Sequence, residues 1–185
     1  MKTTIHALLA LLLAAPAVAS ERALLADRST IGFTVKQMGA PVSGSFRHFS
    51  AHISIDPAKI ESASANIEVD VASISTGYDE GDDAARDKLW LDVAGFPKAT
   101  FKSTSVRALG DDRYEARGTL TIRGKPRQLA VPFTLSNNAD GTATVAGEFT
   151  IRRSDFAVGG GEWNEGDLVA NEVPVRFRLT LGALR

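Results

Sequence analysis

Ala65-Asn66-Ile67-Glu68-Val69-Asp70-Val71 is the stretch of sequence that decides the fold. Small and apolar side chains at 65, 67, 69 and 71 alternate with polar side chains at 66, 68 and 70. A period of two is typical of a β-strand that packs one face against a core and exposes the other. The same alternation runs through Tyr114–Arg123 and Val173–Leu181, so half-buried strands are the main element of this chain.

Alternating segments of this kind, about eight or nine in number, recur along most of the chain. They cover residues 31–36, 42–49, 53–56, 65–71, 99–106, 114–123, 129–135, 145–151 and 173–181. Turns rich in Gly, Asn, Asp and Pro separate several of them, and only Asp79–Leu91 reads as a short helix. Because parallel strands need crossover connections, antiparallel strands joined by short loops fit better. We expect one all-β domain.

The polar faces of these strands indicate which side of the sheet is dry. Lys36, Glu68 and Arg117 stand on faces that cannot point at lipid, whereas a membrane barrel needs an apolar exterior. The apolar faces therefore point inward, into a sandwich core or the lumen of a small barrel. Small residues share this inner parity, and they either leave room for a guest molecule or mark bends where strands curl. They are Gly44, Ala65, Ala116, Gly118, Ala143 and Gly147.

The overall composition excludes several classes of function. The 185 residues include 21 Lys and Arg against 22 Asp and Glu, so the chain lacks the basic excess on which non-specific nucleic-acid binding depends. It contains no cysteine, which excludes disulfides, thiolate catalysis and iron–sulfur sites. We expect no nucleic-acid partner.

The N-terminal segment has the pattern of a secretory signal peptide. Lys2 gives a positive start, and residues 7–15 form an apolar run that is too short to span a bilayer. Ala17-Val18-Ala19 then supplies the small residues that suit a signal peptidase. We expect a signal peptide at 1–19, a folded domain at 20–185, and an exported protein without stable membrane insertion.

Histidines, carboxylates and nucleophiles do not form a recognisable catalytic or metal-binding motif in the sequence. His48 and His52 would lie about 13 Å apart on an extended strand, too far to share a metal ion. The carboxylates of residues 79–83 lack the order of a calcium-binding EF-hand loop, so a solvated acidic loop is favoured. Neither a nucleophile elbow nor a phosphate-binding loop occurs. We expect no catalytic residues and no metal site.

Charged and aromatic residues stand beside the irregular segments. Arg86-Asp87 and Arg152-Arg153-Ser154-Asp155 either clamp loops against the sheet or meet a polar head group. Trp90 and Trp163 either plug an end of a barrel or line an entrance for an apolar ligand. Both explanations stay open for each.

Five stretches of the chain form an ordered series. They read Ser29-x-Ile31-Gly32-Phe33-x-Val35-Lys36 with Val42-x-Gly44-x-Phe46; Ile67-x-Val69-x-Val71-x-Ser73-Ile74-x-Thr76-Gly77; Asp92-Val93-x-x-Phe96-Pro97-x-Ala99-x-Phe101-x-Ser103; Tyr114-x-Ala116-x-Gly118-x-Leu120-Thr121-Ile122-Arg123-Gly124; and Gly147-x-Phe149-x-Ile151-x-Arg153-x-Asp155-Phe156. In this order and spacing they resemble the YceI-like family of bacterial exported proteins. One departure is that Arg86-Asp87-Lys88-Leu89-Trp90 lacks the histidine of the R-D-x-H-L text that members often carry.

The resemblance implies an antiparallel, eight-stranded lipocalin-like barrel with one short helical segment near 79–91. It implies a periplasmic binding or carrier protein, not an enzyme, whose apolar lumen takes a long-chain isoprenoid lipid. The ligand expected is a polyisoprenoid or quinone-like lipid such as a ubiquinone, and no other cofactor is required. We expect the ligand-binding residues to be Phe33, Val35, Phe46, Ile67, Val69, Phe101, Leu120, Ile122, Phe149, Trp163 and Phe177.

Three other functions stay open. The first is an exported binding module for another small amphiphile, such as a fatty acid or amide, with Arg152, Arg153 and Asp155 selecting its head group. The second is a hydrolase that uses carboxylates of residues 79–92. The third is a solidly packed barrel that acts through its surface on a protein partner. A homodimer is an open alternative to the monomer.

Overall fold

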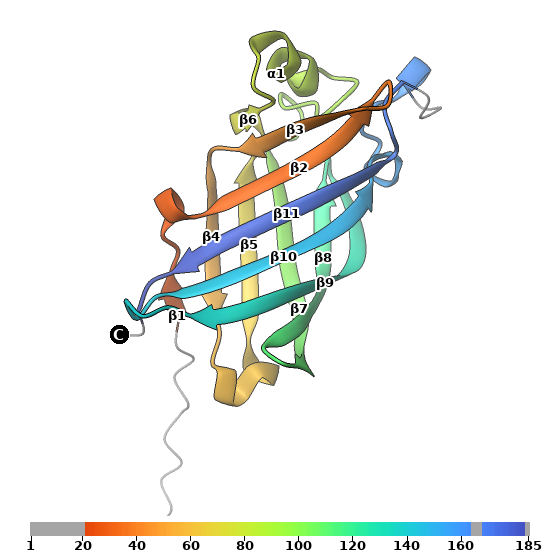
Figure 1. The fold of residues 1–185 in the computed structure, drawn as a ribbon. Helices are drawn as coiled ribbons and strands as arrows, with labels where there is room; N and C mark the ends of the chain where they lie inside the picture. The colour runs from red at the N-terminus through yellow and green to blue at the C-terminus, as the bar shows by residue number, and fades with distance from the viewer. Residues whose placement is uncertain (1–20, 164–167, 184–185) are drawn as a thin grey trace, which may run out of the picture.

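The computed structural model describes residues 21–163 and 168–183, where the chain forms a curled antiparallel sheet and one α-helix (Figure 1). The strands are β1 (Glu21–Ala23), β2 (Thr30–Gln37), β3 (Ala40–Phe46), β4 (Phe49–Ser54), β5 (Ser64–Asp70), β6 (Ile74–Ser75), β7 (Lys98–Gly110), β8 (Arg113–Ile122), β9 (Lys125–Asn137), β10 (Ala143–Arg152) and β11 (Glu172–Leu181). The helix α1 spans Asp79–Arg86, and short 3₁₀ turns lie at Ala26–Arg28, Pro57–Ser62, Val71–Ser73, Arg153–Phe156 and Gly161–Trp163. The predicted signal peptide lies outside the described residues.

The sheet closes on itself as a barrel. Its strands follow the order β1-β4-β5-β7-β8-β9-β10-β11-β2-β3-β6. The strands next to the two ends of that order, β3 and β4, are joined across only Arg47 and His48. At the seam, Arg47 donates its backbone N–H to the Ser73 carbonyl at 3.1 Å, and Leu24 bridges to Leu181. The all-β, antiparallel, lipocalin-like fold is therefore confirmed.

The strand count differs from the predicted eight because the structure has eleven strand segments. Three strand positions are each divided by a kink: β1 and β2 at residues 24–29, β3 and β4 at 47–48, and β5 and β6 at 71–73. Phe46 and Phe49, which one regular strand would place on opposite faces, both pack against the core because the strand breaks between them.

The helix is shorter than the predicted segment 79–91. Asp87 leaves the helical conformation, with φ −58° and ψ 159°, and its carboxylate accepts the Leu89 backbone N–H at 2.8 Å. The chain from 87 to 97 then forms turns rather than helix. Among the residues described, no helix is long and apolar enough to cross a bilayer.

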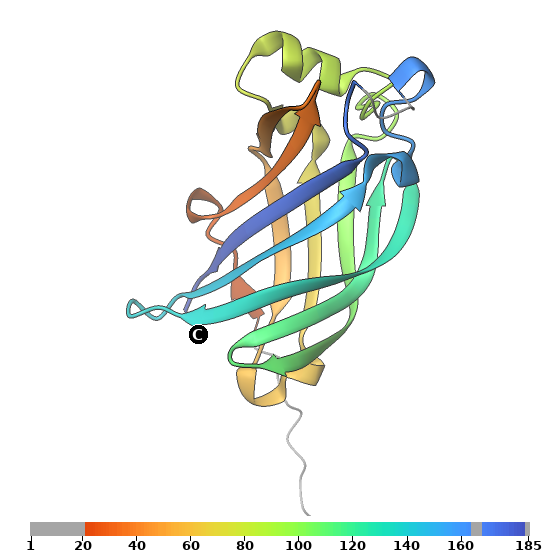
Figure 2. The same cartoon turned by 45° about the vertical axis from the view of Figure 1, so that its right-hand side comes forward.

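The two ends of the barrel differ. We name the end with α1, the β2–β3 turn and Gly161–Trp163 the mouth, and the opposite end, with Pro57–Ser62 and the β7–β8 and β9–β10 turns, the floor (Figures 1 and 2). Inward-facing residues near the floor are buried and form the packed core. They include Ile53, Ile55, Val106, Leu135, Ala143, Val145, Leu179 and Leu181.

Candidate ligand-binding site

The barrel is packed at the floor and hollow toward the mouth. Along β11, Leu179 and Leu181 are buried, whereas Val173, Val175 and Phe177 on the same inner face are only half-buried. The space that they face is a cavity of about 420 Å³. This volume lies within the range of small-molecule binding sites, so the lumen is large enough for a ligand.

All eleven residues predicted to contact a ligand line this cavity. They are Phe33, Val35, Phe46, Ile67, Val69, Phe101, Leu120, Ile122, Phe149, Trp163 and Phe177. Strand parity brings ten of them to the wall from strands all round the barrel, and Trp163 arrives from the connection between β10 and β11. That these side chains contact a ligand stays a prediction.

Sequence reasoning missed the cover of the cavity at the mouth. Tyr78, Gly81 and Ala85, at and within α1, line the cavity together with Trp90 and Leu91. Strand alternation carries no information about a helix that lies across the end of a barrel. The two tryptophans, noted as plugs or entrance residues, were the available signal. The few polar residues on the wall are Gln37, Ser54, Ser64, Thr76, Thr100 and Arg153.

Three inner-face glycines are covered by phenylalanine rings. Phe33 lies opposite Gly44 and Phe177 lies opposite Gly147 in the strand register, and the Phe101 ring lies over Gly118. The space beside each glycine is therefore filled by a phenylalanine ring and not by a guest molecule. Because the glycine has no side chain, the ring can lie against the barrel wall, and the middle of the lumen stays open. Of these three glycines, Gly118 alone lies beside an irregularity in strand pairing. It pairs with Ser103 of β7, and the register shifts between Ser103 and Ser105.

Alanine at two of these glycines is expected to give different results. In Gly147→Ala the new Cβ would overlap the Pro132 carbonyl oxygen, which belongs to the neighbouring backbone, so we expect unfolding free energy to fall by about 1–3 kcal/mol. In Gly44→Ala the Cβ meets the Phe33 ring, which can turn into the lumen, so stability changes less. Urea unfolding of both variants measures the difference, and equal losses would contradict this account.

Arg153 is the strongest polar anchor at the mouth. The side chain is only 3% exposed and donates to the carbonyls of Ala170 (3.2 Å), Val158 (2.9 Å), Gly159 (2.9 Å), Val169 (2.9 Å) and Trp163. These bonds use all five N–H donors of the guanidinium. Burial lowers the pKa of Arg153 below its ordinary value, although a guanidinium stays protonated. Of the two explanations for Arg153, the clamp is confirmed.

An aromatic pair lies over the Arg153 clamp. The Trp90 and Trp163 ring centroids are 5.7 Å apart, and the Arg153 guanidinium carbon lies 5.6 Å from the centroid of Trp90. Attraction between the cation and the ring quadrupole adds to the packing. Both tryptophans line the cavity, so the pair forms part of its wall at the mouth.

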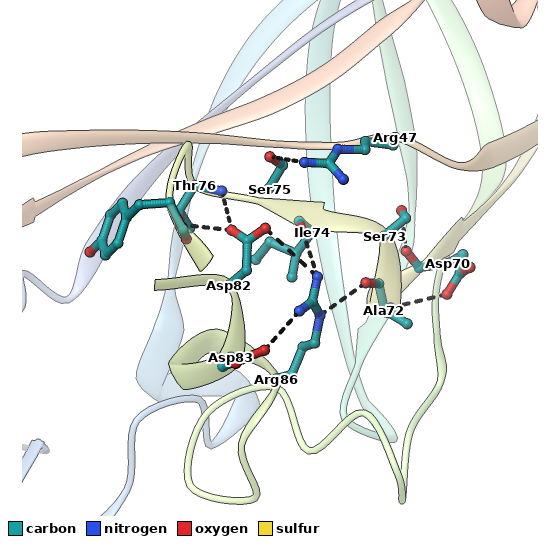
Figure 3. Close-up of polar contacts among 11 residues, drawn as sticks. Arg47, Asp70, Ala72, Ser73, Ile74, Ser75, Thr76, Asp82, Asp83 and Arg86 are labelled. Atoms are coloured by element: carbon teal, nitrogen blue, oxygen red, sulfur yellow. Dashed lines mark hydrogen bonds and ion pairs between the residues drawn. The ribbon is translucent and has the colours of Figure 1, made fainter. Parts of the chain in front are cut away.

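Polar contacts hold α1 in place at the mouth (Figure 3). Asp82 accepts hydrogen bonds from the Thr76 backbone N–H at 2.5 Å and from the Thr76 hydroxyl at 2.8 Å. Arg86 donates to the Ala72 carbonyl at 3.1 Å and to the Ile74 carbonyl at 3.2 Å. Arg86 thus clamps α1 to β6 and the turn before it. Asp82 is buried, which differs from the predicted solvated acidic loop.

The contribution of Asp82 to stability is expected to depend on pH. The backbone hydrogen bond from Thr76, then its hydroxyl, hold the pKa of Asp82 below its ordinary value. Because the folded pKa is lowered, ionised Asp82 stabilises the fold above the ordinary aspartate range, and this stabilisation is lost as the pH falls below that range. We therefore expect the unfolding free energies of wild type and Asp82→Asn to differ most near neutrality and to converge in acid.

Chemical denaturation at a series of pH values measures this difference. Asp83→Asn is the matched control, because the Asp83 side chain is 81% exposed. A difference between wild type and Asp82→Asn that stays constant down to strongly acidic pH would contradict the role given to Asp82.

The remaining titratable candidates occupy separate structural positions. His52 Nδ1 lies 2.9 Å from Glu21 Oε1 and His48 Nδ1 lies 3.9 Å from Asp70 Oδ2, and both histidines are exposed. Asp92 lies 3.8 Å from Arg123. Among the described residues, no group of three metal-ligating side chains comes together.

Comparison with known proteins places this geometry in a family. The family model of the YceI-like domain matches residues 23–181. A UPF0312 protein of Shewanella baltica is 33% identical over 135 residues, which cover 70% of this chain and 71% of the relative. The crystal structure of BcnA from Burkholderia cenocepacia is 38% identical and covers 85% of this chain and 98% of its own, with a TM-score of 0.83.

A more distant structure shares the fold. It is a polyisoprenoid binding domain from Saccharophagus degradans, described as implicated in plant cell wall breakdown. It is 19% identical and covers 89% of this chain and 98% of its own, with a TM-score of 0.70. With the family model spanning nearly the whole barrel, this chain belongs to the YceI-like domain family.

Proposed function

We propose that this protein is a periplasmic binding or carrier protein that holds a polyisoprenoid-type, ubiquinone-like lipid in the lumen of its barrel. The observation that carries the proposal is the cavity of about 420 Å³, whose wall is almost wholly apolar. Burial of an apolar chain there contributes about 25 cal/mol per Å², before the costs of association are subtracted. A neighbour of the same fold is described as a polyisoprenoid binding domain, which makes isoprenoids the ligand class to test first.

The wall at the mouth favours a neutral head group over a carboxylate. A fatty acid would need a hydrogen-bond donor for its charged end, and Arg153 is the guanidinium on the cavity wall. All five of its N–H donors already bond backbone carbonyls. We therefore place the fatty-acid module second to the isoprenoid carrier.

We propose that the protein acts by binding its ligand and not as an enzyme. A hydrolase built from residues 79–92 would need converging carboxylates that are free to react. Instead Asp82 bonds Thr76, Asp87 accepts the Leu89 N–H, and Asp92 lies beside Arg123. These separate structural contacts support a binding role. The signal-peptide pattern of residues 1–19 supports the periplasmic location.

Intrinsic fluorescence tests the ligand class. The chain has only two tryptophans, and both line the cavity. We expect a short-chain ubiquinone to quench their emission in a saturable manner and palmitate to compete weakly. Trp90→Phe and Trp163→Phe assign the signal to each position. No saturable response to the quinone, or stronger binding of palmitate, would overturn the proposed ligand.

A further inference from the structure

The exposed apolar side chains gather at one end of the barrel. In the part of the chain that the structure describes, the exposed large hydrophobic residues are Met38, Tyr78, Leu89, Leu168 and Leu109, with Met38 the most exposed at 77%. Four of them belong to mouth segments: the β2–β3 turn, the residues flanking α1, and the chain leading into β11. Leu109 alone lies near the β7–β8 turn at the floor.

Backbone hydrogen bonds fix where these side chains stand. The Met38 N–H donates to the Leu168 carbonyl at 2.7 Å, which places the two residues side by side. The Leu89 carbonyl accepts from Gly159 at 2.9 Å and from Gly160 at 3.1 Å. Met38, Leu89 and Leu168 are not among the residues that line the cavity. Neither the core nor the lumen explains them.

We infer that the mouth docks on the surface of an electrically neutral lipid bilayer, with Met38, Leu89 and Leu168 entering its interfacial region. The inference rests on the proposed function, because a long isoprenoid chain leaves and enters membranes and its exposure to water is unfavourable for every methylene. When the mouth contacts the bilayer, less of the isoprenoid chain is exposed to water during its transfer. The apolar residues stand on the end that the cavity reaches, as such a transfer requires.

The distribution of these residues favours a bilayer over a protein partner. Met38 and Leu168 stand side by side, whereas Leu89 projects from a separate segment. So small and divided a set suits a deformable surface, whereas a protein partner would need a larger contiguous patch. The charge beside them favours a neutral surface. Asp79, Glu80, Asp83 and Asp87 are exposed on and after α1, against exposed Lys36 and Lys88 on the segments of Met38 and Leu89. The acidic residues outnumber these basic ones, so an anionic surface is repelled on balance at this side of the mouth.

The absence of natural cysteine makes the test direct. Single variants Met38→Cys and Leu109→Cys are each labelled with an environment-sensitive dye and mixed with phosphatidylcholine vesicles. We expect a blue shift at position 38 and none at position 109. Adding phosphatidylglycerol at low ionic strength weakens the response, and added salt restores it, because salt screens repulsion between exposed charges.

A second measurement uses vesicle affinity. The double variant Met38→Ser/Leu168→Ser is expected to bind phosphatidylcholine vesicles at least about tenfold more weakly, and Leu109→Ser to bind them like wild type. An unresponsive dye at position 38, equal responses at both positions, or unchanged affinity of the double variant would overturn the inference. So would a shift at position 38 that depends on protein concentration without vesicles, which indicates a second copy on this face.

The two proposals can fail separately. Vesicle binding is read without any isoprenoid present, and ligand loading is read by tryptophan quenching without vesicles. Normal loading with no vesicle response overturns the docking inference alone. Vesicle docking by a protein that takes up no quinone overturns the proposed ligand.

Discussion

Arg153→Leu is expected to lower the free energy of unfolding by about 3–5 kcal/mol, because it removes the shared donor of five backbone carbonyls at the mouth. Leucine supplies no donor, so those carbonyls that stay buried lose their partners. The contact with the Trp90 ring is lost as well. Urea unfolding followed by far-ultraviolet circular dichroism measures the loss.

Two further variants separate the clamp from simple loss of charge. Arg152→Leu removes the neighbouring arginine, which is exposed, and should change stability little. Arg153→Lys keeps the charge but supplies fewer donors, so an intermediate loss is expected. Equal stability of Arg153→Leu and Arg152→Leu would contradict the clamp.

Ala65→Trp is expected to weaken binding of a long isoprenoid by about 100-fold, since the indole would displace about three to four methylenes of the ligand, each worth about 0.8 kcal/mol. Ala65 lines the cavity from β5, on the same inner face as Ile67 and Val69. Isothermal titration measures the affinity, because the added indole would change a tryptophan-quenching signal.

The matched control for Ala65→Trp is Ala130→Trp. Ala130 is exposed on β9 and is not among the cavity-lining residues, so the same side chain there should leave the ligand affinity unchanged. Unfolding of both variants is compared first, so that a loss of affinity is not a loss of fold. Equal affinities of folded Ala65→Trp and wild type would show that the ligand does not occupy this part of the lumen.

Strand alternation alone predicted ten of the residues that line the cavity. Phe33 and Val35, or Ile67 and Val69, share a face because residues two apart on a strand point the same way. A kink divides a strand into two segments, and within each segment residues two apart still point to the same face. For this reason the inward positions could be predicted although three of the eight strand positions are divided.

Features that depend on how separate elements of the structure meet could not be predicted. Asp82 stands among Asp79, Glu80 and Asp83, and only the position of Thr76 against α1 distinguishes it. The role of Gly147 depends on the strand register that sets Phe177 opposite to it. Arg153 acts on carbonyls that lie as far along the chain as Ala170. Nothing local in the sequence encodes these pairings.

Organic extraction of the protein purified from its natural host, followed by mass spectrometry, tests the central claim most directly. The hollow apolar lumen predicts that an isoprenoid lipid is recovered in close to one copy per protein, and that Ala65→Trp recovers much less. Repeated preparations that yield no lipid, from a folded protein that also takes up no added quinone, would contradict the claim.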